Sequence, residues 1–280
     1  MNDTQLFFET FNSAAEEGYN KAFEGKTPDE ALKMNEEDIY SFLQKSIEKW
    51  SITPLSGMQD QTPRRIIEEI KDLIGIIEYF KIGSILCDKD LPEILLKKVK
   101  SYGEEAENEL IKLASDGKLI EDDKNIYISL LAIRILGKWK VSKAIPSIIL
   151  AMDFCTAANE IVFEEVMEAL ISMGTDATNT LINRLNEVED ISSKEEYILT
   201  ALVKIACGNK SDEVFGCIKN TFNKMDDKLL GAMCLGDYGD WRAIATLKGF
   251  IKKSNANIKK DTYLEIKAAI KRLGGDISDI

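Results

Sequence analysis

Hydrophobic residues recur at steps of three and four along most of the chain, a pattern typical of amphipathic α-helices. The first stripe covers residues 2–25 and ends at a glycine suited to cap a helix. Further stripes cover residues 35–50 and 62–81, separated by a loop at 51–61 that contains proline and glycine. Few stretches show the period-two alternation of β-strands, so the pattern predicts an all-α fold.

From residue 91 onward the helical stripes come in pairs. We expect the two helices of each pair to join at Gly103, Gly137, Gly174, Gly208 and Gly236, with a last helix ending at Gly274. These glycines are separated by 34, 37, 34, 28 and 38 residues, which is the period of a helical-hairpin repeat. Stacking would cover the face that each hairpin leaves open. We therefore expect a repeat array at residues 91–280, capped by an N-terminal helical region at residues 1–90.

The clearest join lies at residues 235–247 and reads Leu-Gly-Asp-Tyr-Gly-Asp-Trp-Arg-Ala-Ile-Ala-Thr-Leu. Its Asp240 can cap the N-terminus of the second helix. The join at residues 136–149 has a similar pattern, with Leu-Gly followed by Lys-Ala-Ile-Pro and a later Ile. A polar break at residues 117–124 is a second place where a domain boundary could fall.

These joins resemble the HEAT-repeat superfamily, in particular the HEAT-like units named after phycobilisome lyases. Their recurring core is Leu-Gly, a short linker with Asp, then Arg-Ala-Ile-Pro and Leu. Residues 235–247 match with Ala245 in place of the proline, and residues 136–149 match with Val141 where Asp is expected. The resemblance covers about residues 91–275. It implies a right-handed α-solenoid of stacked helical hairpins with an N-terminal extension, and it says little about function.

The net charge and the absence of histidine exclude several classes of partner and of catalytic or metal site. The chain has 48 acidic and 36 basic residues and a net charge of −12, which repels phosphate backbones and makes a nucleic-acid partner improbable. It contains no histidine, which excludes His-containing zinc sites and the Ser-His and Cys-His nucleophile pairs. The iron site of deoxyhypusine hydroxylases, which resemble this superfamily, also needs histidine. We expect neither a metal nor another cofactor, and enzyme activity is disfavoured, although a carboxylate acting in a cleft stays open.

The cysteine pattern and the lengths of the hydrophobic runs predict the cellular compartment of the protein. The five cysteines include no Cys-x-x-Cys pair, so we expect buried thiols in a reducing compartment. The N-terminal residues do not have the pattern of a secretory signal, and no uncharged run is long enough to span a bilayer. We therefore expect a cytoplasmic protein with no membrane partner.

An acidic stripe is the first candidate binding feature. Glu160, Glu164 and Glu168 follow at steps of four and therefore share one helix face, with Glu165 beside them. Such carboxylates could attract a basic peptide or, less readily, a hard cation. The alternative is an ordinary solvated helix face.

The turns between paired helices contain the second candidate binding feature. Aligning the two best repeats places Trp139 opposite Tyr238 and Lys143 opposite Arg242. Aromatic and Arg side chains are enriched in interface hot spots, so Trp139, Tyr238, Trp241 and Arg242 could contact a partner. The alternative is that they pack within the hairpin turn. The resemblance also implies that Asp240 can pair with a basic residue of an adjacent repeat.

Three functions fit these patterns. The leading hypothesis is a non-enzymatic scaffold or adaptor that binds a protein or peptide along the inner surface formed by the second helices of its hairpins. The acidic stripe would favour a basic partner. The first alternative is a small-molecule site or a lyase-like protein, by analogy with the tetrapyrrole lyases that share these repeats. The second is nucleic-acid binding, as in HEAT-like DNA glycosylases, which would need lysines gathered on one side.

Overall fold

A computed structural model describes residues 3–87, 90–155, 160–254, 258–278 and 280. Across these ranges the regular structure is helical and no β-strand occurs, which confirms the all-α prediction. No helix in the same ranges is long and apolar enough to cross a membrane. The chain forms two compact units: unit 1 comprises Met1–Leu113 and Asp122–Leu131, and unit 2 comprises Ala114–Glu121 and Ala132–Ile280. The helix pair at residues 91–113 therefore groups with the N-terminal helices.

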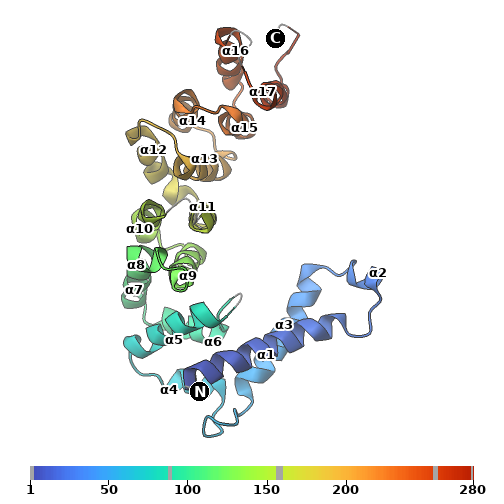
Figure 1. Ribbon diagram of the computed structural model, residues 1–280, viewed down its shortest axis with the longest axis vertical. Helices are drawn as coiled ribbons and strands as arrows, with labels where there is room; N and C mark the ends of the chain where they lie inside the picture. The colour runs from blue at the N-terminus through green and yellow to red at the C-terminus, as the bar shows by residue number, and fades with distance from the viewer. Residues whose placement is uncertain (1–2, 88–89, 156–159, 255–257, 279) are drawn as a thin grey trace. The chain divides into compact units, whose positions relative to one another are not determined.

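Unit 1 is built on a long antiparallel pair, α1 and α3, followed by shorter helices (Figure 1). Its helices are α1 (Asp3–Phe23), α2 (Pro28–Ala31), α3 (Glu36–Ile52), α4 (Pro63–Glu69), α5 (Leu73–Leu86), α6 (Glu93–Ser101), most of α7 (Glu104–Ala114) and the first part of α9 (Ile126–Lys138).

Aromatic side chains hold α1 against α3 in unit 1. The ring of Trp50 lies 5.2 Å from the rings of both Phe7 and Phe11 in edge-on arrangements, the geometry that aromatic quadrupoles favour. Further along the pair, Gly18 lets the backbones approach closely, because a Cβ at this position would lie 2.8 Å from Cα of Leu43. The predicted helix starts are also confirmed, since Asn35 caps α3 by accepting a hydrogen bond from the amide of Asp38 at 2.8 Å.

The single helix predicted at residues 62–81 is wrong. The structure has two helices there, α4 and α5, because the backbone of Ile70 is extended with ψ at 114°. Asp72 then begins the second helix, and its Oδ1 accepts a hydrogen bond from the amide of Gly75 at 2.7 Å. The apolar stripe continues across this break, so hydrophobic periodicity alone could not reveal it.

Unit 2 contains the remaining helices and three short 3-10 turns. They are α8 (Gly117–Ile120), the rest of α9, η1 (Ser142–Ala144), α10 (Ile145–Ala151), η2 (Met152–Phe154), α11 (Glu160–Met173), η3 (Gly174–Ala177), α12 (Thr178–Glu187), α13 (Ser193–Ala206), α14 (Asp212–Lys224), α15 (Leu229–Tyr238), α16 (Ala243–Lys253) and α17 (Lys260–Arg272).

The later helices of unit 2 pack in a regular alternation. Helix α11 packs on α13, α13 on α15 and α15 on α17, while α12 packs on α14. In Figure 1 the odd-numbered helices α11 to α17 lie on one side of unit 2, and the even-numbered α10 to α16 lie on the other. The odd-numbered helices α11 to α17 therefore each contact the equivalent helix of the adjacent pair, and α12 does so with α14.

The expected role of the glycines is only partly right. Gly103, Gly174 and Gly274 have positive φ values of 56°, 70° and 79° and make the turns that we expected. Gly137 and Gly236, in contrast, lie inside α9 and α15. The turns after these two helices are made by Lys140 and Gly239, with φ values of 54° and 74°.

The two helical glycines bring neighbouring helices together. A Cβ on Gly137 would lie 2.7 Å from Cα of Ala169 in α11, and one on Gly236 would lie 2.9 Å from Cβ of Ala269 in α17. Protein interiors are close-packed, so contacts this short leave no room for another methyl group. These glycines therefore set how closely successive odd-numbered helices pack.

We predict that Gly137→Ala destabilises the protein by about 1–3 kcal/mol, because the added methyl group meets backbone atoms that cannot move independently. The matched control is Gly216→Ala within α14, where a Cβ would meet nothing within 4 Å. Alanine should stabilise that helix by about 0.5–1 kcal/mol. Urea unfolding followed by circular dichroism measures both changes. Equal effects of the two substitutions would contradict the packing role of Gly137.

Candidate functional site

The predicted glutamate stripe lies on the exposed face of α11. Glu160, Glu164 and Glu168 are all exposed, whereas Glu165 turns away and its Oε1 accepts a hydrogen bond from Nε of Arg134 at 3.0 Å. Glu168 forms an ion pair of 3.6 Å with Lys204 of α13. Glu160 and Glu164 form no ion pair with any described residue. They are therefore the part of the stripe whose charge is free to act on a partner.

Helix α13 extends this acidic surface. The ring of Tyr197 lies 5.7 Å from the ring of Phe163, which joins α13 to α11. Burial raises the pKa of Tyr197, and the nearby charges of Glu164, Glu160 and Glu196 raise it further. Three carboxylates from two helices thus act electrostatically on one phenol.

The surface continues toward the start of α15. Burial raises the pKa of Glu196, and the negative charge of Asp227 adds to this rise. Asp227 is itself held by Lys259, with an Nζ to Oδ2 distance of 2.8 Å, and by the amide of Leu229 at 3.0 Å. We define the acidic face as Glu160, Glu164, Glu196, Tyr197 and Asp227. Sequence reasoning missed Glu196 and Asp227, although Glu196 follows Glu160 by 36 residues, close to the repeat period.

Tyr238 packs inside the turn between α15 and α16 instead of facing solvent. Its side chain is 1% exposed. The hydroxyl accepts a hydrogen bond from the amide of Ser211 at 2.8 Å and lies 3.2 Å from the Ser211 carbonyl, to which it donates. Ser211 caps α14, so this tyrosine fastens one hairpin to the next. Tyr238 could have contacted a partner or packed within the hairpin turn, and in the structure it packs within the turn.

Arg242 makes a second link at the same turn. Its guanidinium donates to both carboxylate oxygens of Asp240, at 3.0 and 2.7 Å, and to Oδ1 of Asp212 in α14 at 2.7 Å. It also stacks over the ring of Phe215, with 4.4 Å to the centroid. Asp240 thus pairs within its own turn, and Arg242 makes the contact with the preceding hairpin. Trp241 between them is 72% exposed and is available to a partner.

The seven residues proposed from sequence do not form one site. The three glutamates lie on α11, Trp139 is half-buried after the end of α9, and Tyr238, Trp241 and Arg242 belong to the turn between α15 and α16. Of these residues, only the glutamates lie near further acidic groups from outside their own helix, namely Glu196 of α13 and Asp227 before α15. The acidic face is therefore the better candidate for binding.

A cluster that sequence reasoning did not identify joins α12, α13 and η2. Arg184 lies 2.9 Å from Asp153 and 3.2 Å from Glu195, and Lys194 lies 3.0 Å from Asp153. Burial acts to raise the pKa of Asp153, but the hydrogen bonds from Lys194 and Arg184 outweigh it and lower the pKa. Glu195 is 3% exposed and also accepts from the amide of Ser192 at 3.2 Å. These carboxylates are held by cations and have a structural role.

Two buried thiols, Cys217 and Cys234, are held in their protonated form. Burial raises the pKa of Cys217 to about 11 and that of Cys234 to about 12, so both thiols stay protonated near neutral pH. Across the described ranges, no group of three or more Cys, Asp or Glu side chains could hold a metal ion.

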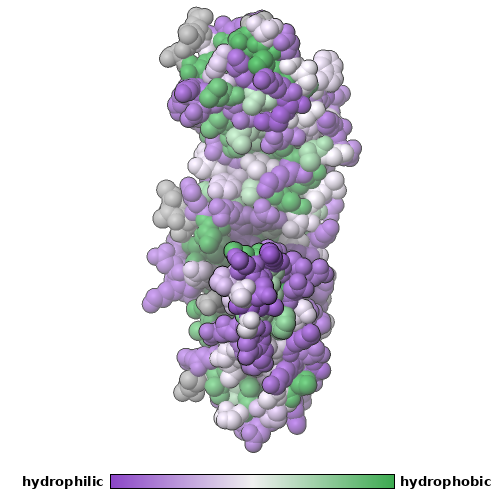
Figure 2. Space-filling model, turned by 90° about the vertical axis from the view of Figure 1, so that its right-hand side faces the viewer, coloured by the Kyte–Doolittle hydropathy of each residue, from purple (hydrophilic) through white to green (hydrophobic). Residues whose placement is uncertain are grey.

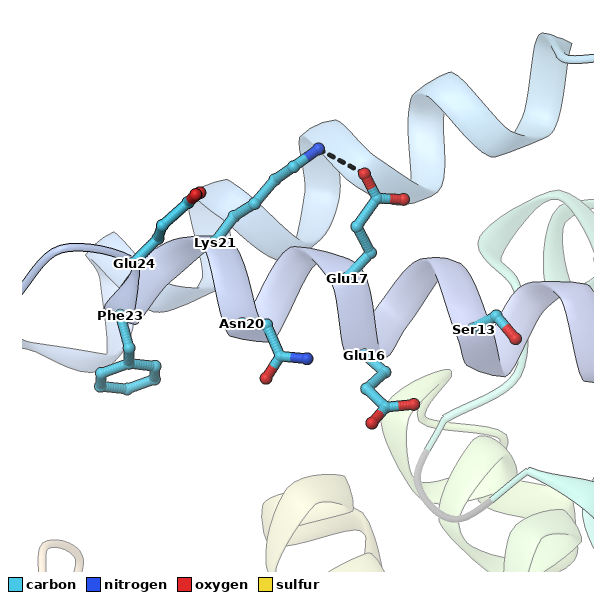
Figure 3. Close-up of a pocket in the computed structure, with 7 residues that line it drawn as sticks. All are labelled: Ser13, Glu16, Glu17, Asn20, Lys21, Phe23 and Glu24. Carbon is cyan, nitrogen blue, oxygen red and sulfur yellow. Dashed lines mark hydrogen bonds and ion pairs between the residues drawn. The ribbon is translucent and has the colours of Figure 1, made fainter.

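An open pocket of about 560 Å³ lies along α1 in unit 1 (Figure 3). Its lining side chains come from this helix and from Glu24 directly after it, and Lys21 forms an ion pair with Glu17 there. Because a single stretch of chain lines it, the pocket is an open depression in the surface. It is lined by Ser13, Glu16, Glu17, Asn20, Lys21, Phe23 and Glu24.

Comparisons with protein-family models, with curated proteins and with solved structures give no match to this chain.

We predict that Asp240→Asn weakens the pH dependence of stability. The hydrogen bonds from Arg242 lower the pKa of Asp240, so its carboxylate stabilises the fold above the unfolded pKa of about 3.9, and this stabilisation is lost as the pH falls through the lower, folded pKa. The free energy of unfolding should therefore drop less between about pH 5 and pH 3 in Asp240→Asn than in the wild type.

The control is Asp261→Asn, which changes an exposed residue of α17. It should leave the wild-type pH dependence in place. Urea unfolding at each pH measures the free energies. A pH dependence of Asp240→Asn equal to that of the wild type would rule out the stabilising role of the carboxylate.

Proposed function

We propose that this chain is a non-enzymatic scaffold or adaptor of the HEAT-like type that binds a basic protein or peptide on the acidic face. The observation that carries the proposal is the gathering of Glu160, Glu164 and Glu196 on α11 and α13 without a cation from the described residues to neutralise them. Like charges held together raise the free energy of the unbound protein, and a basic partner relieves this repulsion.

The proposed architecture is a right-handed α-solenoid formed by the helix pairs of residues 91–275. Two observations support it: the alternating packing of α11 to α17, and the resemblance of residues 136–149 and 235–247 to HEAT-like units. A solenoid of this kind presents equivalent helices side by side, which suits it to binding an elongated partner. We place the protein in the cytoplasm, consistent with its five free cysteines.

A basic partner is favoured over nucleic acid by the sign of the charge. The acidic face would repel a phosphate backbone, and the net charge of −12 adds to that repulsion. Among the described residues no group of three or more Cys, Asp or Glu side chains could hold a metal ion, and burial raises the pKa of the Cys217 and Cys234 thiols, which keeps them protonated near neutral pH. Protein binding therefore accounts for the surface with the fewest additional assumptions.

We predict that a photo-crosslinking amino acid at position 200 captures a discrete partner in cell extract. Thr200 lies on α13 between Glu196 and Lys204, so it samples the acidic face. The matched control places the same amino acid at position 220, an exposed Asn of α14 on the even-numbered side. Gel electrophoresis after irradiation detects the crosslinked band, and the double variant Glu160→Lys, Glu164→Lys should abolish it. Indistinguishable bands from positions 200 and 220 would argue against partner binding at this face.

A further inference from the structure

Three odd-numbered helices of unit 2 expose a large apolar side chain, and α13 between them carries a half-buried tyrosine. Ile161 of α11, Met233 of α15 and Leu264 of α17 are 50%, 40% and 53% exposed, and Tyr197 of α13 is half-buried. These four residues, which we call the apolar row, are separated by 36, 36 and 31 residues along the chain. Tyr197, Met233 and Leu264 each occupy the fifth position of their helix. Figure 2 views the molecule from this side, where hydrophobic residues lie among hydrophilic ones.

Ion pairs show that residues about one repeat apart lie side by side on these helices. Glu168 of α11 lies 3.6 Å from Lys204 of α13, and Asp237 of α15 lies 3.4 Å from Arg272 of α17. The pairs join positions 36 and 35 residues apart, close to the 36-residue steps from Ile161 to Tyr197 and from Tyr197 to Met233. These three residues therefore cross α11, α13 and α15 at nearly the same level, whereas Leu264, 31 residues after Met233, lies about one helical turn nearer the N-terminal end of α17.

The charge on the two sides of the apolar row differs. Toward the C-terminal ends of the helices, the acidic groups are neutralised by the ion pairs of Lys204 and Arg272. Toward the N-terminal ends lie Glu160 and Glu196, which have no ion pair within the described residues. Positive charge on a partner is therefore favoured beside Ile161 and Tyr197, whereas the N-terminal ends of α15 and α17 carry Lys228, Lys259 and Lys260.

The spacing of the apolar row fits a helical partner. Packed helices lie about 8–10 Å apart, so neighbouring members of the row repeat at about that distance. A partner α-helix rises about 1.5 Å per residue and returns to nearly the same face after seven residues, at about 10.5 Å. A β-strand returns to the same face at about 6.6 Å or 13 Å, and neither distance matches. A second copy of this chain is disfavoured because it carries the same net charge of −12.

We propose that a basic amphipathic helix of a partner protein docks across α11, α13, α15 and α17. It places one apolar side chain every seventh residue on the apolar row and Lys or Arg side chains against Glu160, Glu164 and Glu196. This assignment rests on the proposed function and specifies the chemistry of the partner. It uses helix-in-groove recognition, in which apolar anchors supply affinity and flanking charges fix the register.

The test uses a fluorescently labelled synthetic helix of about 24 residues, with Leu at one position of every heptad and Lys and Ala elsewhere. Fluorescence anisotropy measures its affinity for the full chain. We expect saturable binding that weakens with added salt. Met233→Gln should weaken binding about tenfold by removing an anchor, and so should the double variant Glu160→Lys, Glu164→Lys.

Two protein controls and one peptide control accompany these variants. Leu150→Gln changes an apolar residue of α10 that is 45% exposed, close to the exposure of Met233, and should leave the affinity unchanged. Glu213→Lys reverses an exposed charge of α14 outside the face and should have little effect. A peptide of the same composition with Leu distributed around the helix should bind at least about tenfold more weakly.

Equal binding of the two peptides, or equal effects of Met233→Gln and Leu150→Gln, would overturn the docking of an amphipathic helix. If the crosslinker at position 200 captured a partner while neither peptide bound, the helical partner would be wrong and the scaffold function would stand. Failure of both the peptide and the crosslinker would overturn both proposals.

Discussion

The close approach of neighbouring helices at small residues governs the regular part of this molecule. At Gly137 the backbone of Ala169 comes nearly into contact with α9, and at Gly236 the methyl group of Ala269 and the guanidinium of Arg272 lie directly against α15. This fixes both the distance between successive odd-numbered helices and their register along one another. Side chains about 36 residues apart consequently appear next to one another on the same face. The acidic face and the apolar row both follow from this register.

Polar contacts between successive hairpins secure that register and determine which charges stay free. Ser142 donates to Asp176, Tyr238 bonds with Ser211, and Arg242 reaches Asp212. Each of these contacts links turns or helix ends about one repeat apart. The cations that could have neutralised Glu160 and Glu164 are used elsewhere, as with Arg134 on Glu165 and Lys204 on Glu168. Glu160 and Glu164 are therefore acidic residues that the contacts between hairpins leave without an ion pair among the described residues.

The helices could be predicted from sequence because their signals are local. Asn35 begins α3 through its own side chain, and the apolar stripes identify the faces that pack. The role of each glycine depends on residues far away in the sequence: Gly137 and Gly236 leave room for Ala169 and Ala269 of the neighbouring helices. The same holds for the site. The stripe on α11 was visible from its spacing, but the contribution of Glu196 depends on how α13 packs on α11, and the burial of Tyr238 depends on Ser211.

Docking of a basic amphipathic helix on the exposed face of the odd-numbered helices can be tested by methyl NMR of the isotopically labelled protein, titrated with the synthetic basic helix. We expect the methyl signals of Ile161, Met233 and Leu264 to shift, while those of Leu150 on α10 and Ile74 on α5, which are also exposed, stay unchanged. Shifts confined to Leu150 or Ile74, or spread evenly over all exposed methyl groups, would contradict it.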